Sequence, residues 1–271
     1  MSKSAHLRIQ DVRAILQVVG ECRDAGDGSA AWKQHLLRTA SRLVSADLLT
    51  ATEMAARGSP PAILDLTSWG WENGFDQDTW LQGLAAFQST PSFSNGWNRY
   101  SERLRQDDGV ALARPDFVSD KEYEASTEYQ GVFRPLGLGN GMMCFRSLPM
   151  AGGVIFGISL WRAAGAQDFG GRDRVLLREL QAGIAPLIGG PLARPGEPSP
   201  ADLSPRVRQV LRCLLEGDGD KQIASRLGLT RHTVNEYTKA LFRHFGVQSR
   251  AELLARWVRR GFPTRFSWEE E

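Results

Sequence analysis

Between positions 231 and 243 the sequence spaces charged and amide side chains so that a helix would carry them on one face. At about 100° per residue, one arc holds Arg231, His232, Asn235, Glu236, Lys239 and Arg243. The opposite arc holds Val234, Thr238, Leu241 and Phe245. Lysine and arginine suit phosphate oxygens and guanine edges, asparagine can pair with adenine, and glutamate can accept from the cytosine amino group. Such a face can read duplex DNA, whereas a solvated helix face of no function has a similar composition.

The elements around this segment favour the first reading. Residues 203–254 predict four short helices separated by glycines. In the first, an apolar stripe recurs at helical spacing: Val207, Val210, Leu211, Leu214 and Leu215. Ser204 can cap this helix, and Pro205 suits its first position, where no backbone N–H is needed. Helices of about three turns are marginal alone, so the four must pack together.

The second and third helices are spaced like a helix-turn-helix. The second covers about 220–227 and ends at Gly228, and Thr230 caps the third, which we expect over about 230–245. The fourth opens with the capping box Ser249 and Glu252. A helix-turn-helix places its second helix in the major groove of DNA, so this spacing predicts a DNA-binding module.

Three stretches of this region resemble the LuxR-type, or GerE-like, helix-turn-helix family. They are LSPRVRQVL (203–211), KQIASRLGLTRHTV (221–234) and FGVQSRAEL (245–253). The resemblance implies a four-helix DNA-binding domain of a bacterial transcription regulator, with no gap across the match. It is more specific than the helix-turn-helix spacing alone.

The resemblance also implies which residues touch DNA. Asn235, Glu236 and Lys239 correspond to base-reading positions, and the backbone-contacting positions correspond to Lys221, Thr230 and Arg243; Arg231 lies on the same polar face. The sequence departs from the family at three positions: Val207 replaces the usual acid of a capping box, Asn235 replaces a common lysine, and Thr238 replaces a bulkier aliphatic residue. The fold survives these departures, but the base preference of other members cannot be transferred.

Charge is concentrated in this region. Residues 201–265 hold 13 lysine and arginine residues against 6 aspartate and glutamate residues, a net +7, while residues 1–200 hold 20 against 22. A basic module on a nearly neutral body fits a protein that meets phosphate locally. Such a module binds weakly as a monomer, and regulators of this size usually read two half-sites as a symmetric dimer. We therefore expect a homodimer bound to double-stranded DNA, formed partly through residues 250–260.

A proline-rich segment separates the two halves. GPLARPGEPSPADLSP (190–205) holds five prolines and few large apolar residues, a composition typical of an extended linker. We predict a sensor or dimerisation domain over 1–189, a linker over 190–202 and the helix-turn-helix domain over 203–265.

The front half alternates helix and strand signals. Helices are predicted near 9–20, 29–45 and 76–87, from 119 toward 133, and from about 170, with a bend near Pro186. Strands are predicted at 47–55 and 62–71, and a hairpin at 141–148 and 152–161. Helices around an antiparallel sheet give an α+β fold.

This order is similar to GAF or PAS-like sensory modules, on the pattern of DKEYEASTEYQGVFRPLGL (120–138) and DFGGRDRVLLREL (168–180). The resemblance implies a sensor that responds to an unknown small-molecule or redox signal, or a ligand-free dimerisation module. The clustered acids of a phosphoreceiver domain and the aromatic and acidic pattern of acyl-homoserine-lactone receptors are not evident.

Aromatic residues are dense over a short stretch: Trp69, Trp71, Trp80, Trp97 and Tyr100. They fit an aromatic-lined ligand pocket, but core packing is the more common use of such residues. Cys22, Cys144 and Cys213 are far apart and odd in number, so each is expected to be a small buried side chain. The four histidines are scattered, and we expect no metal, no cofactor and no catalytic residue.

No stretch of the sequence approaches the ~20 apolar residues of a spanning helix, and no export signal is evident, so we expect a cytoplasmic protein without a membrane partner. Three other functions fit the sequence less well. They are an enzyme or ligand-binding protein with a DNA-binding appendage, a sigma-like factor, and an interaction module whose linker and tail bind RNA polymerase.

Overall fold

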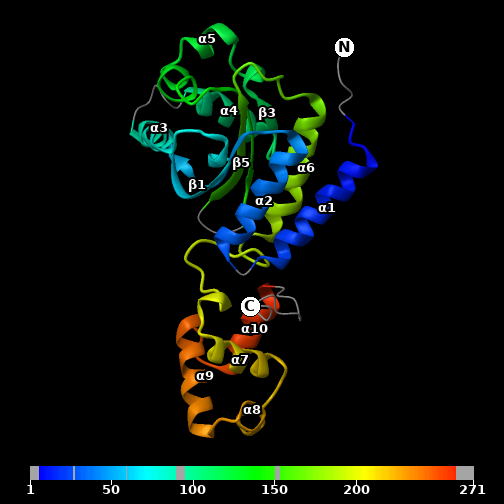
Figure 1. The fold of residues 1–271 in the computed structure, drawn as a ribbon, viewed down its shortest axis with the longest axis vertical. Helices are drawn as coiled ribbons and strands as arrows, with labels where there is room; N and C mark the ends of the chain where they lie inside the picture. Colours follow the sequence, from blue (N-terminus) through cyan, green and yellow to red (C-terminus); the bar gives the residue numbers. More distant parts are fainter. Residues whose placement is uncertain (1–5, 27, 59, 90–94, 150–152, 261–271) are drawn as a thin grey trace. The chain divides into compact units, whose positions relative to one another are not determined.

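The computed structural model of the protein describes residues 6–26, 28–58, 60–89, 95–149 and 153–260. They form two compact units (Figure 1). The first lies within residues 6–22 and 33–187, and the second within 23–32 and 188–260. The limits of the linker, 190 and 202, stay a prediction.

The first unit is built on a five-stranded antiparallel sheet in the order β2-β1-β5-β4-β3. Its strands are β1 (Leu48–Gly58), β2 (Pro61–Trp69), β3 (Ala111–Ala113), β4 (Leu138–Ser147) and β5 (Val154–Ala163). The two predicted strands and the hairpin are present, and the α+β fold is confirmed. Residues 150–152 of the hairpin turn lie outside the described residues.

Helices cover both faces of the sheet (Figure 1). On one face lie α1 (Ile9–Asp24), α2 (Ser29–Val44) and α6 (Gly171–Ile184); on the other lie α3 (Gln77–Ser89), α4 (Asn95–Gln106), α5 (Asp120–Glu124) and a π-helical turn, Tyr129–Phe133. Successive strand residues face opposite ways, so Phe156 of β5 faces the first layer and Ser159 the second. The first eight residues of β5 are buried, because both layers pack on this central strand.

The expected helix from 119 toward 133 is wrong in its length. The capping box of Ser119 and Glu122 forms as predicted, but α5 ends at Glu124 and the chain resumes as the π-helical turn. At the break, Ser126 Oγ donates to the Tyr123 carbonyl at 2.7 Å and accepts from Tyr129 N–H at 3.1 Å. A serine that bonds to nearby backbone offers the chain an alternative to continuous helix.

Helix α4 and strand β3 are absent from the sequence predictions. Strand β3 has only three residues, too few for alternation to show. Helix α4 had a usable signal, because Trp97, Tyr100 and Leu104 recur at i, i+3 and i+7 and pack together against Phe145. The predicted bend near Pro186 appears as a change to a 3-10 turn, Ala185–Leu187, directly after α6.

The second unit contains the four expected helices: α7 (Pro205–Leu215), α8 (Asp220–Leu227), α9 (Arg231–Phe245) and α10 (Arg250–Arg260). Pro205 occupies the first turn of α7, but Ser204 makes no side-chain cap, contrary to our expectation. Its backbone is extended as at a cap, and Val207 cannot supply the reciprocal bond that an acid would make. Ser249 Oγ accepts from Glu252 N–H at 3.2 Å, so the predicted cap of α10 forms.

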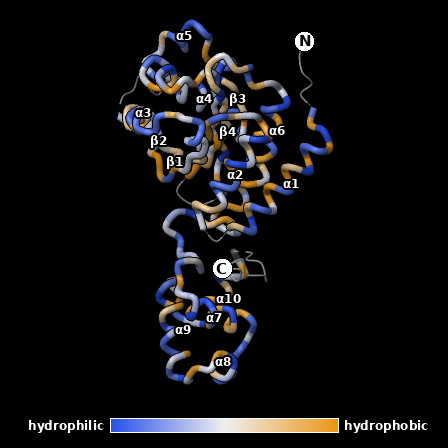
Figure 2. Tube along the Cα trace, in the orientation of Figure 1, coloured by the Kyte–Doolittle hydropathy of each residue, from blue (hydrophilic) through white to orange (hydrophobic). Residues whose placement is uncertain are grey.

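A single apolar core holds these four helices. It includes Leu211 of α7, Ile223 of α8, Leu241 of α9 and Trp257 of α10. In Figure 2 hydrophilic and hydrophobic residues alternate along the helices, as expected when one face of each is buried. Arg250 also donates to the carbonyls of Leu214 and Asp218 at 2.8 and 2.7 Å, which ties the start of α10 to the end of α7.

The first residues of the proline-rich segment are less isolated than their composition suggests. Leu192 and Ala193 are buried. Trp32 Nε1 donates to the Ala193 carbonyl at 2.8 Å, and Ala193 N–H donates to the Gly26 carbonyl at 2.8 Å. Within the second unit, this part of the segment is therefore anchored to the connection between α1 and α2.

The packing of α9 predicts a large effect of one truncation. Leu241→Ala removes a fully buried side chain and should lower the free energy of unfolding of the second unit by about 3 kcal/mol. Denaturant unfolding followed by far-ultraviolet circular dichroism measures it. Leu81→Ala is the matched control, because Leu81 is 51% exposed on α3 of the first unit, and it should change the stability of the second unit by less than about 0.5 kcal/mol. Equal losses in both variants would contradict the described core.

Candidate functional site

Two features of the described residues offer binding chemistry, and the first is the turn between α8 and α9. Gly228 has φ +63°, a left-handed conformation that glycine adopts without strain. Leu229 N–H donates to the Ala224 carbonyl at 2.9 Å. Thr230 Oγ1 then accepts from Thr233 N–H at 3.1 Å and caps α9, as the sequence predicts. This turn fixes the angle at which α9 leaves α8.

The two faces of α9 are those that its spacing predicts. Val234, Leu241 and Phe245 are buried in the core. Thr238 is half-buried, and its hydroxyl donates to the Val234 carbonyl at 2.9 Å. The seven residues predicted to contact DNA are all exposed: Lys221, Thr230, Arg231, Asn235, Glu236, Lys239 and Arg243. Their exposure fits an interface, while their contact with DNA stays a prediction.

Most side chains of this polar face make no hydrogen bond or ion pair with other described residues. Among the described residues, the side chains of Lys221, Arg231, Asn235 and Arg243 make no hydrogen bond or ion pair. Lys239 and Glu236 pair at 2.9 Å, and the Lys239 ammonium lowers the pKa of the Glu236 carboxyl. Their side chains are 58% and 53% exposed, and exposed pairs contribute little. Binding to an external partner can therefore break this pair at small cost.

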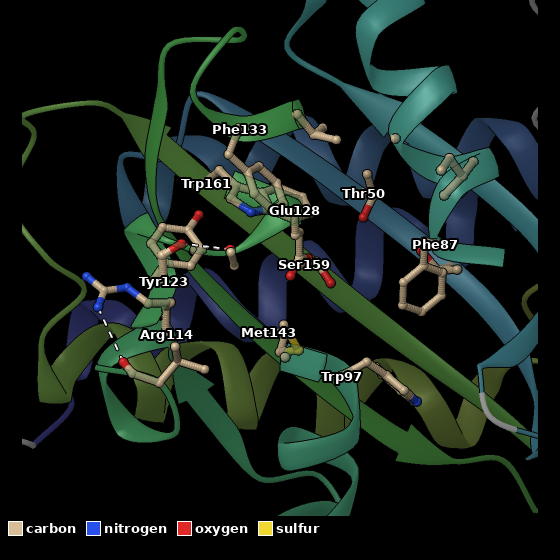
Figure 3. Close-up of a pocket in the computed structure, with 18 of the residues that line it drawn as sticks. Thr50, Phe87, Trp97, Arg114, Tyr123, Glu128, Phe133, Met143, Ser159 and Trp161 are labelled. Carbon is tan, nitrogen blue, oxygen red and sulfur yellow. Dashed lines mark hydrogen bonds between the residues drawn. The ribbon is translucent and has the colours of Figure 1, made fainter. Parts of the chain in front are cut away.

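The second feature is a cavity of about 310 Å³ between the sheet and the layer formed by α3, α4, α5 and the π-helical turn (Figure 3). Strands β1, β4 and β5 supply its floor, including Thr50, Met143 and Ser159. The helical layer supplies aromatic walls, including Trp80, Phe87, Trp97, Tyr123 and Phe133. A largely apolar cavity with a few polar groups is the usual form of a small-molecule site.

Part of the dense aromatic stretch reaches this cavity. Trp80 and Trp97 line it. Trp71 packs on Trp80 with ring centroids 6.2 Å apart, and Tyr100 is fully buried, its hydroxyl donating to the Val110 carbonyl and accepting from Phe145 N–H. Some of these aromatic residues therefore line a cavity and others pack in the core, so each of the two interpretations applies to part of the stretch.

The cavity also contains a carboxyl group that the sequence did not reveal. Glu128 stands at the start of the π-helical turn and lines the cavity. Its burial raises the pKa of the carboxyl to about 7. No periodicity or motif marks this position, because its surroundings come from separate elements.

The cysteines offer no reactive group. Cys22, Cys144 and Cys213 are all buried, as expected, and none of the three forms a disulfide. Burial raises the pKa of Cys22 and of Cys144 to about 12, and it also raises that of Cys213. Since the thiolate is the nucleophile, these thiols are unsuited to catalysis or redox sensing at neutral pH.

Neither a metal site nor a membrane-spanning helix is evident in the described residues. They contain no group of three or more histidine, cysteine, aspartate or glutamate side chains arranged to hold a metal ion. No helix in the same part of the chain has the length and hydropathy needed to cross a membrane.

Comparison with solved structures gives distant similarities. The VqsR LBD domain from Pseudomonas aeruginosa is 17% identical, covering 62% of this chain and 89% of that one, with a TM-score of 0.41. SdiA from Escherichia coli is 14% identical over 93% and 97%, with a TM-score of 0.34. CepR2 from Burkholderia cenocepacia, described as an N-acylhomoserine lactone dependent LuxR family transcription factor, is 10% identical over 63% and 91%, with a TM-score of 0.38. No curated protein sequence matches the chain.

The family comparison is specific to the four-helix region. Residues 201–257 match the family model described as bacterial regulatory proteins, luxR family. The match covers α7, α8 and α9 completely and most of α10, and it agrees with the resemblance found in the sequence. Residues 201–257 therefore form a helix-turn-helix DNA-binding domain of the luxR family of bacterial regulatory proteins.

Proposed function

We propose that the protein is a sequence-specific transcription regulator that inserts α9 into the major groove of double-stranded DNA. The observation that carries the proposal is the exposed, largely unpaired polar face of α9 within a luxR-family domain. Asn235, Glu236 and Lys239 read base edges in this proposal. The other four predicted residues contact the phosphate backbone: Lys221, Thr230, Arg231 and Arg243.

The proposed active form is a homodimer. Residues 201–265 carry a net charge of +7, and a single domain with few contacts binds DNA weakly at physiological salt. Two domains related by a twofold axis would read two half-sites one helical turn apart. Val258 on α10 is 79% exposed, which supports the expectation that α10 contributes to the interface. DNA as the partner places this activity in the cytoplasm.

The proposed signal is a small molecule in the cavity of the first unit. The supporting observation is the combination of an apolar enclosure and a buried carboxyl group with no partner among the described residues. Burying an ionisable group without a partner costs stability, and such groups concentrate at functional sites. Core packing alone gives no reason for a carboxyl at this position.

The DNA-binding proposal is tested by Asn235→Ala combined with Lys239→Ala. The pair removes two base-reading side chains and no core contact, so specific affinity should fall at least about 100-fold with unchanged stability. Electrophoretic mobility shift on an operator selected from random DNA measures it. Gln209→Ala with Arg208→Ala, on α7, likewise removes one amide and one cation, and it should change affinity by less than about threefold. Equal affinity of both double variants for the operator would contradict the assignment of α9 as the helix that reads DNA.

The ligand proposal is tested by filling the cavity. Met143→Trp replaces a flexible side chain of β4 that lines the cavity with a bulky indole ring. The ring should fill the space of the ligand, so a small molecule extracted from the wild-type full chain should be absent from this variant. Mass spectrometry of extracts from both proteins, purified in parallel, measures the difference. Recovery of the same compounds in equal amounts from both would count against the cavity as the site.

The buried carboxyl makes a separate prediction about stability and pH. Glu128 ionises near pH 4.5 when unfolded and at about 7 when folded, so the folded state binds more protons between these values. Wild-type stability should therefore fall as pH rises from about 4.5 to 7, and Glu128→Gln should remove this loss. At pH 8 the variant should be more stable by up to about 3 kcal/mol.

Denaturant unfolding of both full chains at pH 5 and pH 8 measures the effect. Glu124→Gln is the matched control, because Glu124 is an exposed carboxyl four residues away. A difference between wild type and Glu128→Gln that is the same at both pH values would refute the burial of an unpaired carboxyl.

A further inference from the structure

The charged groups that line the cavity differ in whether they have partners. Arg99 Nη2 donates to Glu122 Oε1 at 3.1 Å. Arg114 forms an ion pair with Asp120; its Nη2 also donates to Asn140 Oδ1 at 2.9 Å. Both cations at the cavity wall are therefore already neutralised by carboxylates of this chain.

Glu128 is different. Among the described residues its side chain makes no hydrogen bond or ion pair. Its carboxylate reaches toward the first turn of α4: a Cβ placed on Gly96 would lie 3.4 Å from Glu128 Oε2. The side chain is only half-buried, since part of its surface faces the cavity it lines. Glu128 is thus a carboxylate without a charged partner among the described residues of the cavity wall, where the buried Trp80 Nε1 and Arg114 Nε also lack hydrogen-bond partners.

Glu128 shares the lining of this cavity with several aromatic rings. Figure 3 draws its side chain in the same part of the cavity as Phe133, Trp161 and Tyr123. Phe133 and Trp161 stack with centroids 5.6 Å apart. The Tyr123 ring already carries the Arg114 guanidinium, 4.9 Å from its centroid. Aromatic faces attract cations, and an ammonium among aromatic rings is a recurring recognition mode.

We propose that the cavity binds an organic ammonium, an apolar molecule with one positively charged amine that pairs with Glu128 beside the rings of Phe133 and Trp161. This inference rests on the proposed function, in which the cavity holds the signal. An anionic ligand would face a carboxylate with no cation free to offset it. A neutral ligand without a donor would leave Glu128 buried and unpaired, which is unfavourable. The volume of about 310 Å³ suits a small ligand, at the lower end of the range for such sites.

The test compares three compounds with one apolar body and different head groups: 4-phenylbutylamine, 4-phenylbutanol and 4-phenylbutyrate. Isothermal titration calorimetry on the full chain at pH 8 should show the amine binding at least about tenfold more tightly than the alcohol, and the carboxylate weakest, because only the amine forms a charge-assisted bond with Glu128. Glu128→Gln should reduce the affinity for the amine to that for the alcohol. Glu124→Gln, the exposed control, should leave all three affinities unchanged.

The pH dependence gives an independent readout. The other ionisable groups around the carboxylate keep their charge between pH 6 and 8: Glu122 has a pKa of about 2, burial raises that of Tyr123, and Glu122 raises that of Arg99. Arg114 is a guanidinium, which stays charged in proteins. With the Glu128 pKa at about 7, its ionised fraction rises about tenfold from pH 6 to pH 8. Affinity for the amine should rise by about that factor in wild type and stay constant in Glu128→Gln.

The outcomes separate this inference from the proposed function. If the three compounds bind equally and Glu128→Gln changes none of them, the ammonium proposal is overturned while the cavity remains a ligand site. If 4-phenylbutyrate binds most tightly, the ligand is an anion and the proposed positive charge is wrong. If none binds to wild type, the ammonium proposal fails together with the cavity as a site for molecules of this size. The DNA-binding assay with the α9 variants stands apart from all three results.

Discussion

The burial of strand β5 on both faces is the constraint on which the first unit depends. Its first eight residues are all buried, and it pairs with β1 on one side and β4 on the other. A strand in this position needs a helical layer above and below, because neither of its faces meets water. The cavity lies on one side of this strand, beneath the layer of α3, α4, α5 and the π-helical turn. The cavity is therefore formed by the sheet and by only one of its two helical layers.

The same physical rule positions α9 in the second unit. Val234, Leu241 and Phe245 are buried along one side of the helix, so the residues between them must face outward. Gly228 and Thr230 then set where the helix begins, through a left-handed backbone and a side-chain cap. The direction of the polar face follows from apolar packing and turn chemistry, and Asn235, Glu236 and Lys239 contribute nothing to the apolar core. This separation allows the residues proposed to read bases to vary while the fold is retained.

Apolar packing and turn chemistry explain which features could be predicted from the sequence. Helical periodicity, caps and glycine stops are local, so the four helices of the second unit and the polar face of α9 follow from residues close in the chain. The hairpin of β4 and β5 is similarly local. The break after Glu124 depends on how Ser126 bonds to its neighbours, which composition does not show. β3 is too short for a pattern, and α4 was overlooked although Trp97, Tyr100 and Leu104 carry a helical period.

The cavity lies beyond local patterns for a further reason. Its walls come from residues as distant in sequence as Thr50 and Trp161, and Glu128 becomes unusual only when those elements enclose it. From the sequence alone, Glu128 cannot be distinguished from an ordinary solvent-exposed acid such as Glu124, four residues before it. The two sites also use charge in opposite ways. The α9 face keeps its cations in solvent, where they cost nothing and can meet phosphate. The cavity holds an anion away from solvent, where its charge is unfavourable until a partner arrives. An unpaired carboxyl of this kind links its protonation to the binding of a positively charged partner, because the ionised form alone can make a charge-assisted bond.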